Sequence, residues 1–185
     1  MKKMILISIF CFIALVFNAY AATLQKGDNA FARSNLRAHK YLLLWHNLSF
    51  SKDVVLAGTE VKIVTCRGQE VVFTKVGSDR KYKLVANSAQ WDKYFVKDKN
   101  ELNLEKYPAI TTEQGTKSQI VVGMSKEEVY LSKGCPAYIG YGIKSYTHPL
   151  SDIMQSDTWY YMKDSRGHDK MIKFEKGVVI KIGDY

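Results

Sequence analysis

The segment from Val122 to Pro136, VGMSKEEVYLSKGCP, opens with a complete helix start signal. Ser125 and Glu128 have the spacing of a capping box, in which each side chain accepts a hydrogen bond from the other residue's backbone N–H. Met124 before the cap and Val129 after Glu128 are placed to touch as a hydrophobic staple. Together these residues fix the angle at which the chain enters the helix.

The same helix is stopped after only a few residues. Gly134 suits the left-handed position that follows many helices, and Pro136 cannot continue a helix. The sequence therefore predicts a helix from Lys126 to Lys133. A helix of this length is unstable alone in water, so it must pack on another element of the fold.

Three strand signals follow and supply a surface for that helix. They are DTWYYMKD from Asp157, KMIKFE from Lys170 and VVIKIGDY from Val178, separated by SRGH and by Lys176-Gly177. Aromatic and β-branched residues favour strands, and the short separators favour hairpin turns. The residues expected to point inward from the last two strands are Ile172, Phe174, Val178, Ile180 and Ile182. A small helical layer on a three-stranded meander is predicted.

The residues from Tyr41 to Val96 form short alternating runs separated by turn signals, as at Gly58, Gly68 and Gly77. This spacing is typical of a small antiparallel barrel or meander. The polar stretch from Lys97 to Gly115 is interpreted as a connecting region with a short helix near Thr111.

The fold class expected is therefore α+β, with a small β-barrel or meander followed by a two-layer α/β sandwich. Four segments are predicted: a signal peptide over 1–21, a mostly-β domain over 22–105, a linker over 106–115 and a second domain over 116–185.

The N-terminus has the pattern of a secretory signal peptide. Lys2 and Lys3 precede an apolar run from Met4 to Phe17, and Ala19-Tyr20-Ala21 predicts cleavage after Ala21. The run is shorter than the ~20 residues that a membrane-spanning helix needs, so an anchor is the weaker interpretation. Cys11 lies inside the apolar run, not after the cleavage site, which argues against a lipid anchor. A periplasmic or secreted protein without a transmembrane segment after cleavage is expected.

The chain is basic, with a formal net charge of +9 that falls to +7 without Lys2 and Lys3. The lysines are spread along the chain, which favours a solvated surface with at most weak association with anionic surfaces. The sequence contains no basic run interleaved with aromatic residues, so it predicts no nucleic-acid partner. The four histidines lack metal-ligand spacing, and the sequence predicts no cofactor.

Two cysteines remain after the predicted cleavage, Cys66 and Cys135. An even number in an exported chain suggests a disulfide between them. The alternative is that Cys135 is a nucleophile with His148 or His168 as its base. Its position between a helix-ending Gly and a Pro favours a structural role over that alternative.

The C-terminal part of the chain, from about Gln114 to Tyr185, resembles the SmpA/OmlA (BamE-like) domain family. The resemblance rests on an ordered series of residues: Gly123, Met124, Ser125, Glu128, Val129, Gly134, Pro136, Trp159, Tyr161, Phe174 and Gly177. The family implies two helices on a three-stranded antiparallel sheet, no cofactor, no catalysis, and a role in outer-membrane assembly. The expected fold is also similar to that of secreted β-lactamase inhibitor proteins.

Three departures from the family matter. The family's lipidated Cys is absent, and an extra N-terminal β domain precedes the motif. The stretch from Ala137 to Ser156, interpreted as an ordered loop, is longer than usual. One hypothesis is a non-enzymatic interaction module of the cell envelope with an envelope protein as partner. The other is a secreted or periplasmic inhibitor-like or ligand-binding protein. The predicted partner-binding residues in this loop are Tyr138, Tyr141 and Tyr146, whereas Trp159 and Tyr161 are expected to pack under the helix.

Overall fold

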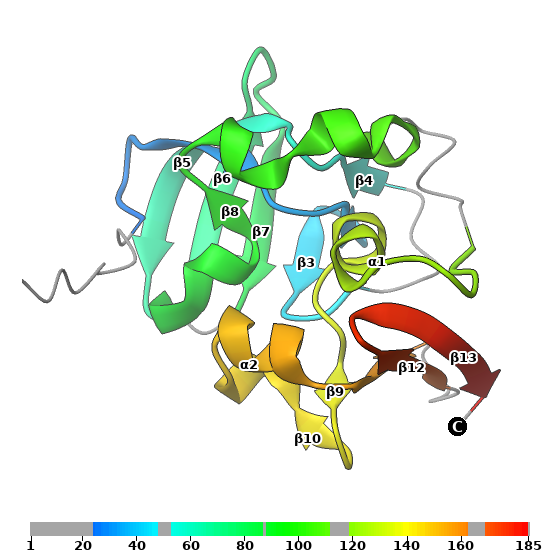
Figure 1. Cartoon of the computed structure of the whole chain (residues 1–185). Helices are drawn as coiled ribbons and strands as arrows, with labels where there is room; N and C mark the ends of the chain where they lie inside the picture. Colours follow the sequence, from blue (N-terminus) through cyan, green and yellow to red (C-terminus); the bar gives the residue numbers. More distant parts are fainter. Residues whose placement is uncertain (1–23, 48–52, 87, 112–118, 163–168, 185) are drawn as a thin grey trace, which may run out of the picture.

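The computed structural model of the 185-residue chain describes residues 24–47, 53–86, 88–111, 119–162 and 169–184. The fold is mixed α+β, with mostly strands and few short helices, which confirms the predicted class (Figure 1). The predicted signal peptide and the SRGH turn lie outside the described residues.

The first sheet has six strands and is curled. Its strand order is β3 (Leu42–Leu44), β7 (Lys81–Val85), β6 (Glu70–Lys75), β5 (Glu60–Arg67), β1 (Asn29–Ala32) and β8 (Phe95–Val96). Strands β5, β6 and β7 form the antiparallel meander that their alternation predicts, but β3 pairs with β7 in parallel. A separate pair, β2 (Leu36–Ala38) and β4 (Asp53–Val55), lies beside this sheet.

The second sheet has five strands where three were predicted. Its order is β10 (Ile143–Lys144), β9 (Tyr138–Ile139), β11 (Thr158–Met162), β12 (Asp169–Glu175) and β13 (Val178–Asp184), all antiparallel. The predicted meander of β11, β12 and β13 is present. The two added strands come from the stretch 137–156, so the prediction of a loop there was wrong for this part.

Helix α1 (Lys126–Lys133) has the predicted bounds and both hydrogen bonds of the capping box. The Glu128 N–H donates to Ser125 Oγ at 3.1 Å, and the Ser125 N–H donates to Glu128 Oε2 at 2.8 Å. Met124, which is partly buried, packs against the buried cluster that contains Val129. The predicted capping box at this end of the helix is therefore confirmed.

The inward face of β13 differs from the prediction by one residue. Val179 is fully buried, whereas Val178 and Ile180 are exposed. The cause is a register shift between Lys173 and Phe174 of β12, which leaves Ile180 as an extra residue in β13. A bulge of one residue reverses the facing of the residues on its far side, and simple alternation does not reveal it.

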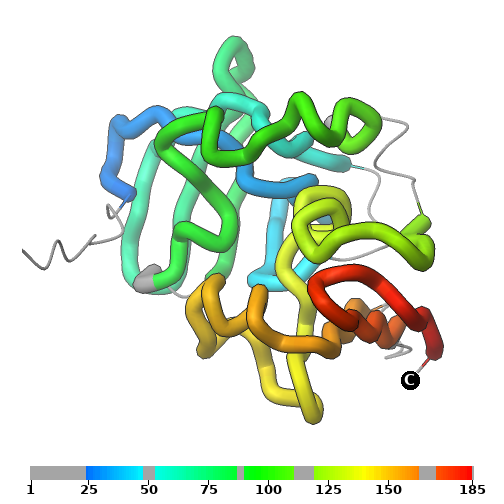
Figure 2. Tube along the Cα trace, in the orientation of Figure 1, coloured from blue at the N-terminus to red at the C-terminus, as the bar shows by residue number. Residues whose placement is uncertain are grey.

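The stretch from Lys97 to Thr111, predicted as part of a connecting region, is packed against the body of the protein. It forms three 3₁₀ turns, η2 (Lys99–Leu102), η3 (Leu104–Lys106) and η4 (Pro108–Thr111). Leu102 and Ile110 are buried, and Ile110 packs with Ala57 and Leu131 of α1. Figure 2 shows this segment, in green, running over the first sheet.

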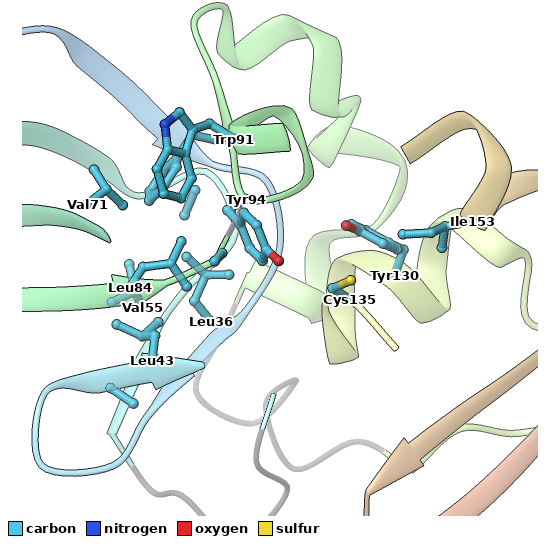
Figure 3. Close-up of a cluster of buried hydrophobic side chains, with 14 of the residues drawn as sticks. Leu36, Leu43, Val55, Val71, Leu84, Trp91, Tyr94, Tyr130, Cys135 and Ile153 are labelled. Atoms are coloured by element: carbon cyan, nitrogen blue, oxygen red, sulfur yellow. The ribbon is translucent and has the colours of Figure 1, made fainter. Parts of the chain in front are cut away.

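One cluster of buried side chains joins the two sheets. It contains Leu36, Leu43 and Leu84 from the N-terminal half, together with Tyr130 and Ile153 from the C-terminal half (Figure 3). Helix α1 lies between the sheets, and its Leu131 carbonyl accepts a 2.8 Å bond from the Asn35 N–H. The position of the second sheet is therefore fixed by packing against the first half of the chain.

Candidate functional site

The most exposed aromatic side chain described is at the tip of the β9–β10 hairpin. Ile143 pairs with Ile139, and the turn Gly140-Tyr141-Gly142 joins the strands. Gly140 and Gly142 have φ of +56° and +88°, values that favour glycine. Tyr141 between them has a relative exposure of 104%, so its ring is not packed against the residues that the structure describes.

An apolar row on the second sheet leads to this hairpin. Ile182, Ile172, Trp159 and Ile139 are consecutive cross-strand partners, and Ile143 continues the row on the edge strand. The inner members are covered, but Ile143 is 51% exposed. Tyr141 and Ile143 together form what we call the hairpin tip, an apolar surface that the chain itself leaves open.

The three tyrosines predicted to bind a partner are not equivalent. Tyr138 is half-buried on β9, opposite Tyr160 of β11. Tyr146 belongs to the turn η6 (Ser145–Thr147), and its ring lies 5.3 Å from the Trp45 ring. Of these three tyrosines, Tyr141 is the one left fully exposed by the described part of the chain, so the structure brings the three into one region without gathering them into one site.

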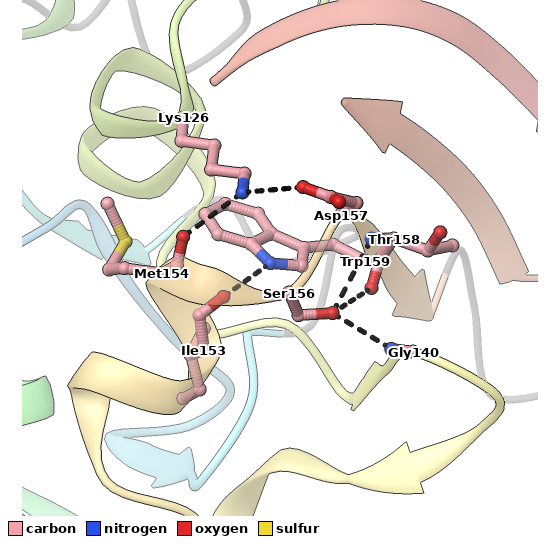
Figure 4. Close-up of polar contacts among 8 residues, drawn as sticks. All are labelled: Lys126, Gly140, Ile153, Met154, Ser156, Asp157, Thr158 and Trp159. Carbon is pink, nitrogen blue, oxygen red and sulfur yellow. Dashed lines mark hydrogen bonds and ion pairs between the residues drawn. The ribbon is translucent and has the colours of Figure 1, made fainter. Parts of the chain in front are cut away.

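The hairpin is held by a polar network beneath it (Figure 4). Ser156 Oγ accepts a 3.0 Å bond from the Gly140 N–H and donates at 3.0 Å to the Thr158 carbonyl. Nearby, Lys126 Nζ donates to the Met154 carbonyl at 3.1 Å and to Asp157 Oδ1 at 3.2 Å. These bonds tie α1, α2 (Leu150–Gln155) and the start of β11 together, so the hairpin projects from a rigid base.

Trp159 and Tyr161 pack under the helices, as expected. Trp159 is fully buried, and its Nε1–H donates to the Ile153 carbonyl of α2 at 2.8 Å. Its ring lies 4.7 Å from the Phe174 ring and 6.1 Å from the Tyr130 ring of α1. The Tyr161 hydroxyl donates to the Gly134 carbonyl at 2.9 Å.

The remaining motif residues shape the backbone around α1 and the last hairpin. Gly134 has φ of +72°, and a Cβ there would clash with Nδ2 of Asn47. Gly177 and Lys176 both have positive φ, as a tight two-residue hairpin turn requires. Gly123 has φ of +97°, and its N–H donates to the Val179 carbonyl at 2.9 Å. Pro136 accepts a hydrogen bond from the Ser145 hydroxyl.

The cysteines do not form the predicted bridge, because Cys66 and Cys135 are both free thiols in the structure. Cys66 is half-buried on β5, whereas Cys135 is buried after α1 at the junction of the two halves. In Figure 3 the Cys135 sulfur lies near the hydroxyl ends of Tyr94 and Tyr130. Cys66 lies near the end of β5 that leads into the turn to β6.

The geometry around Cys135 does not support a nucleophile. Its Sγ lies 3.4 Å from Ser145 Oγ, and burial raises the pKa of the thiol, which disfavours the reactive thiolate. His148 instead pairs with Asp152 at 3.2 Å. His168 lies outside the described residues. Cys135 therefore has the surroundings of a structural residue.

Sequence reasoning missed two polar residues, Asn47 and Lys93, that fix the second half on the first. Asn47 Nδ2 donates to the Asn35 and Lys133 carbonyls, both at 2.6 Å, and its Oδ1 accepts from the Arg37 N–H at 2.9 Å. Lys93 is 1% exposed, and its Nζ donates to the Ser145 carbonyl at 2.8 Å. No local pattern marks these residues, because their partners lie far away in the sequence.

No protein-family model matches the chain, and neither does any curated protein or solved structure. In the part of the chain that the structure describes, no helix is long and apolar enough to cross a membrane. Within the same residues, no group of three or more His, Cys, Asp or Glu side chains is placed to hold a metal ion.

Proposed function

We propose that this chain is an exported, non-enzymatic interaction module of the bacterial cell envelope that binds an envelope protein through the hairpin tip. The observation that carries the proposal is the full exposure of Tyr141 on a base fixed by hydrogen bonds. Tyrosine offers a large contact area at a low cost in conformational entropy, and rigid presentation reduces the cost further.

Two sequence features support the envelope setting. The first is the signal-peptide pattern that ends at Ala21, and the second is the resemblance to the SmpA/OmlA family over Gln114 to Tyr185. We infer a BamE-like two-layer arrangement for this part of the chain. It is supported by α1 and α2, which both contact Trp159 on one face of the β11–β13 meander.

Capture from native envelope extract tests this function. The tagged chain should retain a specific envelope protein, and the Tyr141→Ser variant should lose it at an unchanged melting temperature. Val76→Ser is the matched control, since Val76 is 55% exposed at another hairpin. Capture that survives Tyr141→Ser, or a parent chain that retains nothing, would contradict the proposal.

A further inference from the structure

A pocket of about 400 Å³ lies between the two halves of the chain, at the base of the β9–β10 hairpin. It is lined by Trp45, Gln69, Val85 and Ala86 from the first half and by Lys144 and Tyr146 from the second. The volume is within the roughly 300–1,000 Å³ of pockets that bind small molecules. A smaller pocket of about 180 Å³ is lined in part by Arg37, Lys133 and Lys170, but Arg37 and Lys133 already interact within the protein.

Two consecutive buried residues hold the aromatic walls of the larger pocket in place. The Tyr94 hydroxyl donates to the Trp45 carbonyl at 2.9 Å. The Lys93 Nζ donates to the Tyr146 carbonyl at 3.3 Å and to the neighbouring Ser145 carbonyl at 2.8 Å. Because both aromatic residues are fixed through their backbone, the pocket is already formed before a ligand enters, which lowers the cost of binding.

The Trp45 and Tyr146 rings form a corner of this pocket. Their centroids are 5.3 Å apart, and the ring planes are inclined at 50°. The face of an aromatic ring carries partial negative charge and attracts the polarised C–H groups of a sugar ring. Since the two faces are not parallel, they suit a puckered ring, whose C–H groups point in several directions, better than a flat aromatic ring that stacks between parallel faces.

The polar side chains of the lining are an amide and an ammonium group. Gln69 lies in the turn between β5 and β6, and its carbonyl accepts a 2.9 Å bond from the Ala86 N–H. Within the residues that the structure describes, neither the Gln69 amide nor the Lys144 ammonium has a hydrogen bond or an ion pair to the protein. An amide donates and accepts, and an ammonium donates, so together they can bind hydroxyl groups, which do both.

We propose that this pocket binds a neutral saccharide. One sugar ring occupies the corner between Trp45 and Tyr146, and its hydroxyl groups bind the Gln69 amide and the Lys144 ammonium. The small side chains of Val85 and Ala86 complete the lining and leave room for the ring. This activity goes beyond the capture of an envelope protein, since none of the lining residues belongs to the hairpin tip.

Nuclear magnetic resonance of the purified chain tests the proposal through its tryptophan indole N–H signals. Of the three tryptophans, Trp91 and Trp159 are buried, whereas Trp45 is partly exposed, and a Trp45→Phe variant identifies the Trp45 signal. The probes are cellobiose, maltose and N,N′-diacetylchitobiose, with benzamide as a flat aromatic amide for comparison.

At least one disaccharide should shift the Trp45 signal in a saturable way at millimolar concentration. Benzamide should bind at least about tenfold more weakly, because it lacks the hydroxyl groups for Gln69 and Lys144. Failure of all three disaccharides to shift the Trp45 signal, or equal binding of benzamide, would overturn the proposal.

Substitutions locate the binding. Gln69→Ala should weaken the best disaccharide about tenfold, the loss expected when an amide loses its hydrogen bonds to the ligand, and its exposed turn puts the fold at little risk. Gln155→Ala is the matched control, because Gln155 is exposed at the end of α2 and does not line the pocket. Equal weakening by Gln155→Ala would overturn the location.

The hairpin tip supplies a second control that separates this site from the proposed protein contact. Tyr141→Ser should bind the disaccharide as the parent chain does, because Tyr141 does not line the pocket. A loss of saccharide binding in Tyr141→Ser as large as that in Gln69→Ala would contradict the placement of the sugar between Trp45 and Tyr146.

Discussion

The junction between α1 and the first half of the chain, and the β9–β10 hairpin, use polar and aromatic residues in opposite ways. At the junction, Asn47 and Lys93 are buried and their side-chain donors bind backbone carbonyls across the interface. At the hairpin, Tyr141 is fully exposed and Ile143 is half-exposed. One region uses polar groups to join segments, and the other presents apolar groups to the outside.

This difference predicts that the junction residues determine the stability of the fold and that the hairpin-tip residues determine partner binding. A buried polar group costs free energy unless every hydrogen bond is made, so changes at the junction should destabilise the fold. The hairpin tip makes no such contacts, so changes there should affect partner binding alone.

The largest loss should follow Trp159→Ala. The substitution leaves a cavity next to Phe174 and removes the indole donor to the Ile153 carbonyl. A loss of about 3–5 kcal/mol is expected from comparable core truncations. Urea unfolding followed by far-UV circular dichroism measures it. Because the two sheets share one buried cluster, the transition should stay single, and a separate unfolding step for the first sheet would contradict that view.

A smaller loss should follow Asn47→Ala at the junction. The Arg37 N–H loses its acceptor and the Asn35 and Lys133 carbonyls lose a donor, which costs about 1–3 kcal/mol for a buried group. Asn29→Ala is the control, since the Asn29 side chain bonds Glu60 at an exposed site. Chemical denaturation should show a larger loss of unfolding free energy for Asn47→Ala than for Asn29→Ala. Equal losses would show that the junction is not the stabilising contact.

Ser125→Ala removes the hydroxyl of the capping box. The expected loss is about 1 kcal/mol, the usual value for an N-cap residue. Ser125→Asp should restore most of it, because aspartate also accepts at this position and suits the positive end of a helix. Thermal unfolding of both variants checks this, and a Ser125→Asp variant as unstable as Ser125→Ala would argue against capping as the cause.

The smallest effect on stability should come from Tyr141→Ser. The ring is fully exposed, so the free energy of unfolding should change by less than about 0.5 kcal/mol. Tyr146→Ser should destabilise more, since its ring packs against Trp45. Melting temperatures of the two variants provide the test. A larger decrease for Tyr141→Ser than for Tyr146→Ser would show that Tyr141, and not Tyr146, contributes to stability.

The sequence predicted the parts of the fold that depend on local signals. The bounds of α1, its capping box, the Lys176-Gly177 turn and the meander of β11 to β13 all follow from residues close together in the chain. The bulge at Ile180 and the parallel pairing of β3 were not predicted, because both depend on partner strands.

The candidate sites show the same division. Tyr141 was predicted as a contact residue from local composition, although its full exposure depends on the hairpin around it. The pocket that Arg37, Lys133 and Lys170 help to line was not predicted, because these residues are far apart in the sequence. The packing of Leu102 and Ile110 was also missed, because polar neighbours and Pro108 obscure the burial of these two residues.

Site-specific photocrosslinking in cells tests the central claim most directly, namely that the hairpin tip is the contact surface. A photoreactive phenylalanine analogue at position 141 should crosslink to one envelope protein, and the same analogue at position 76, also exposed, should not. Crosslinks of equal yield at both positions, or a specific product from position 76 alone, would contradict the account.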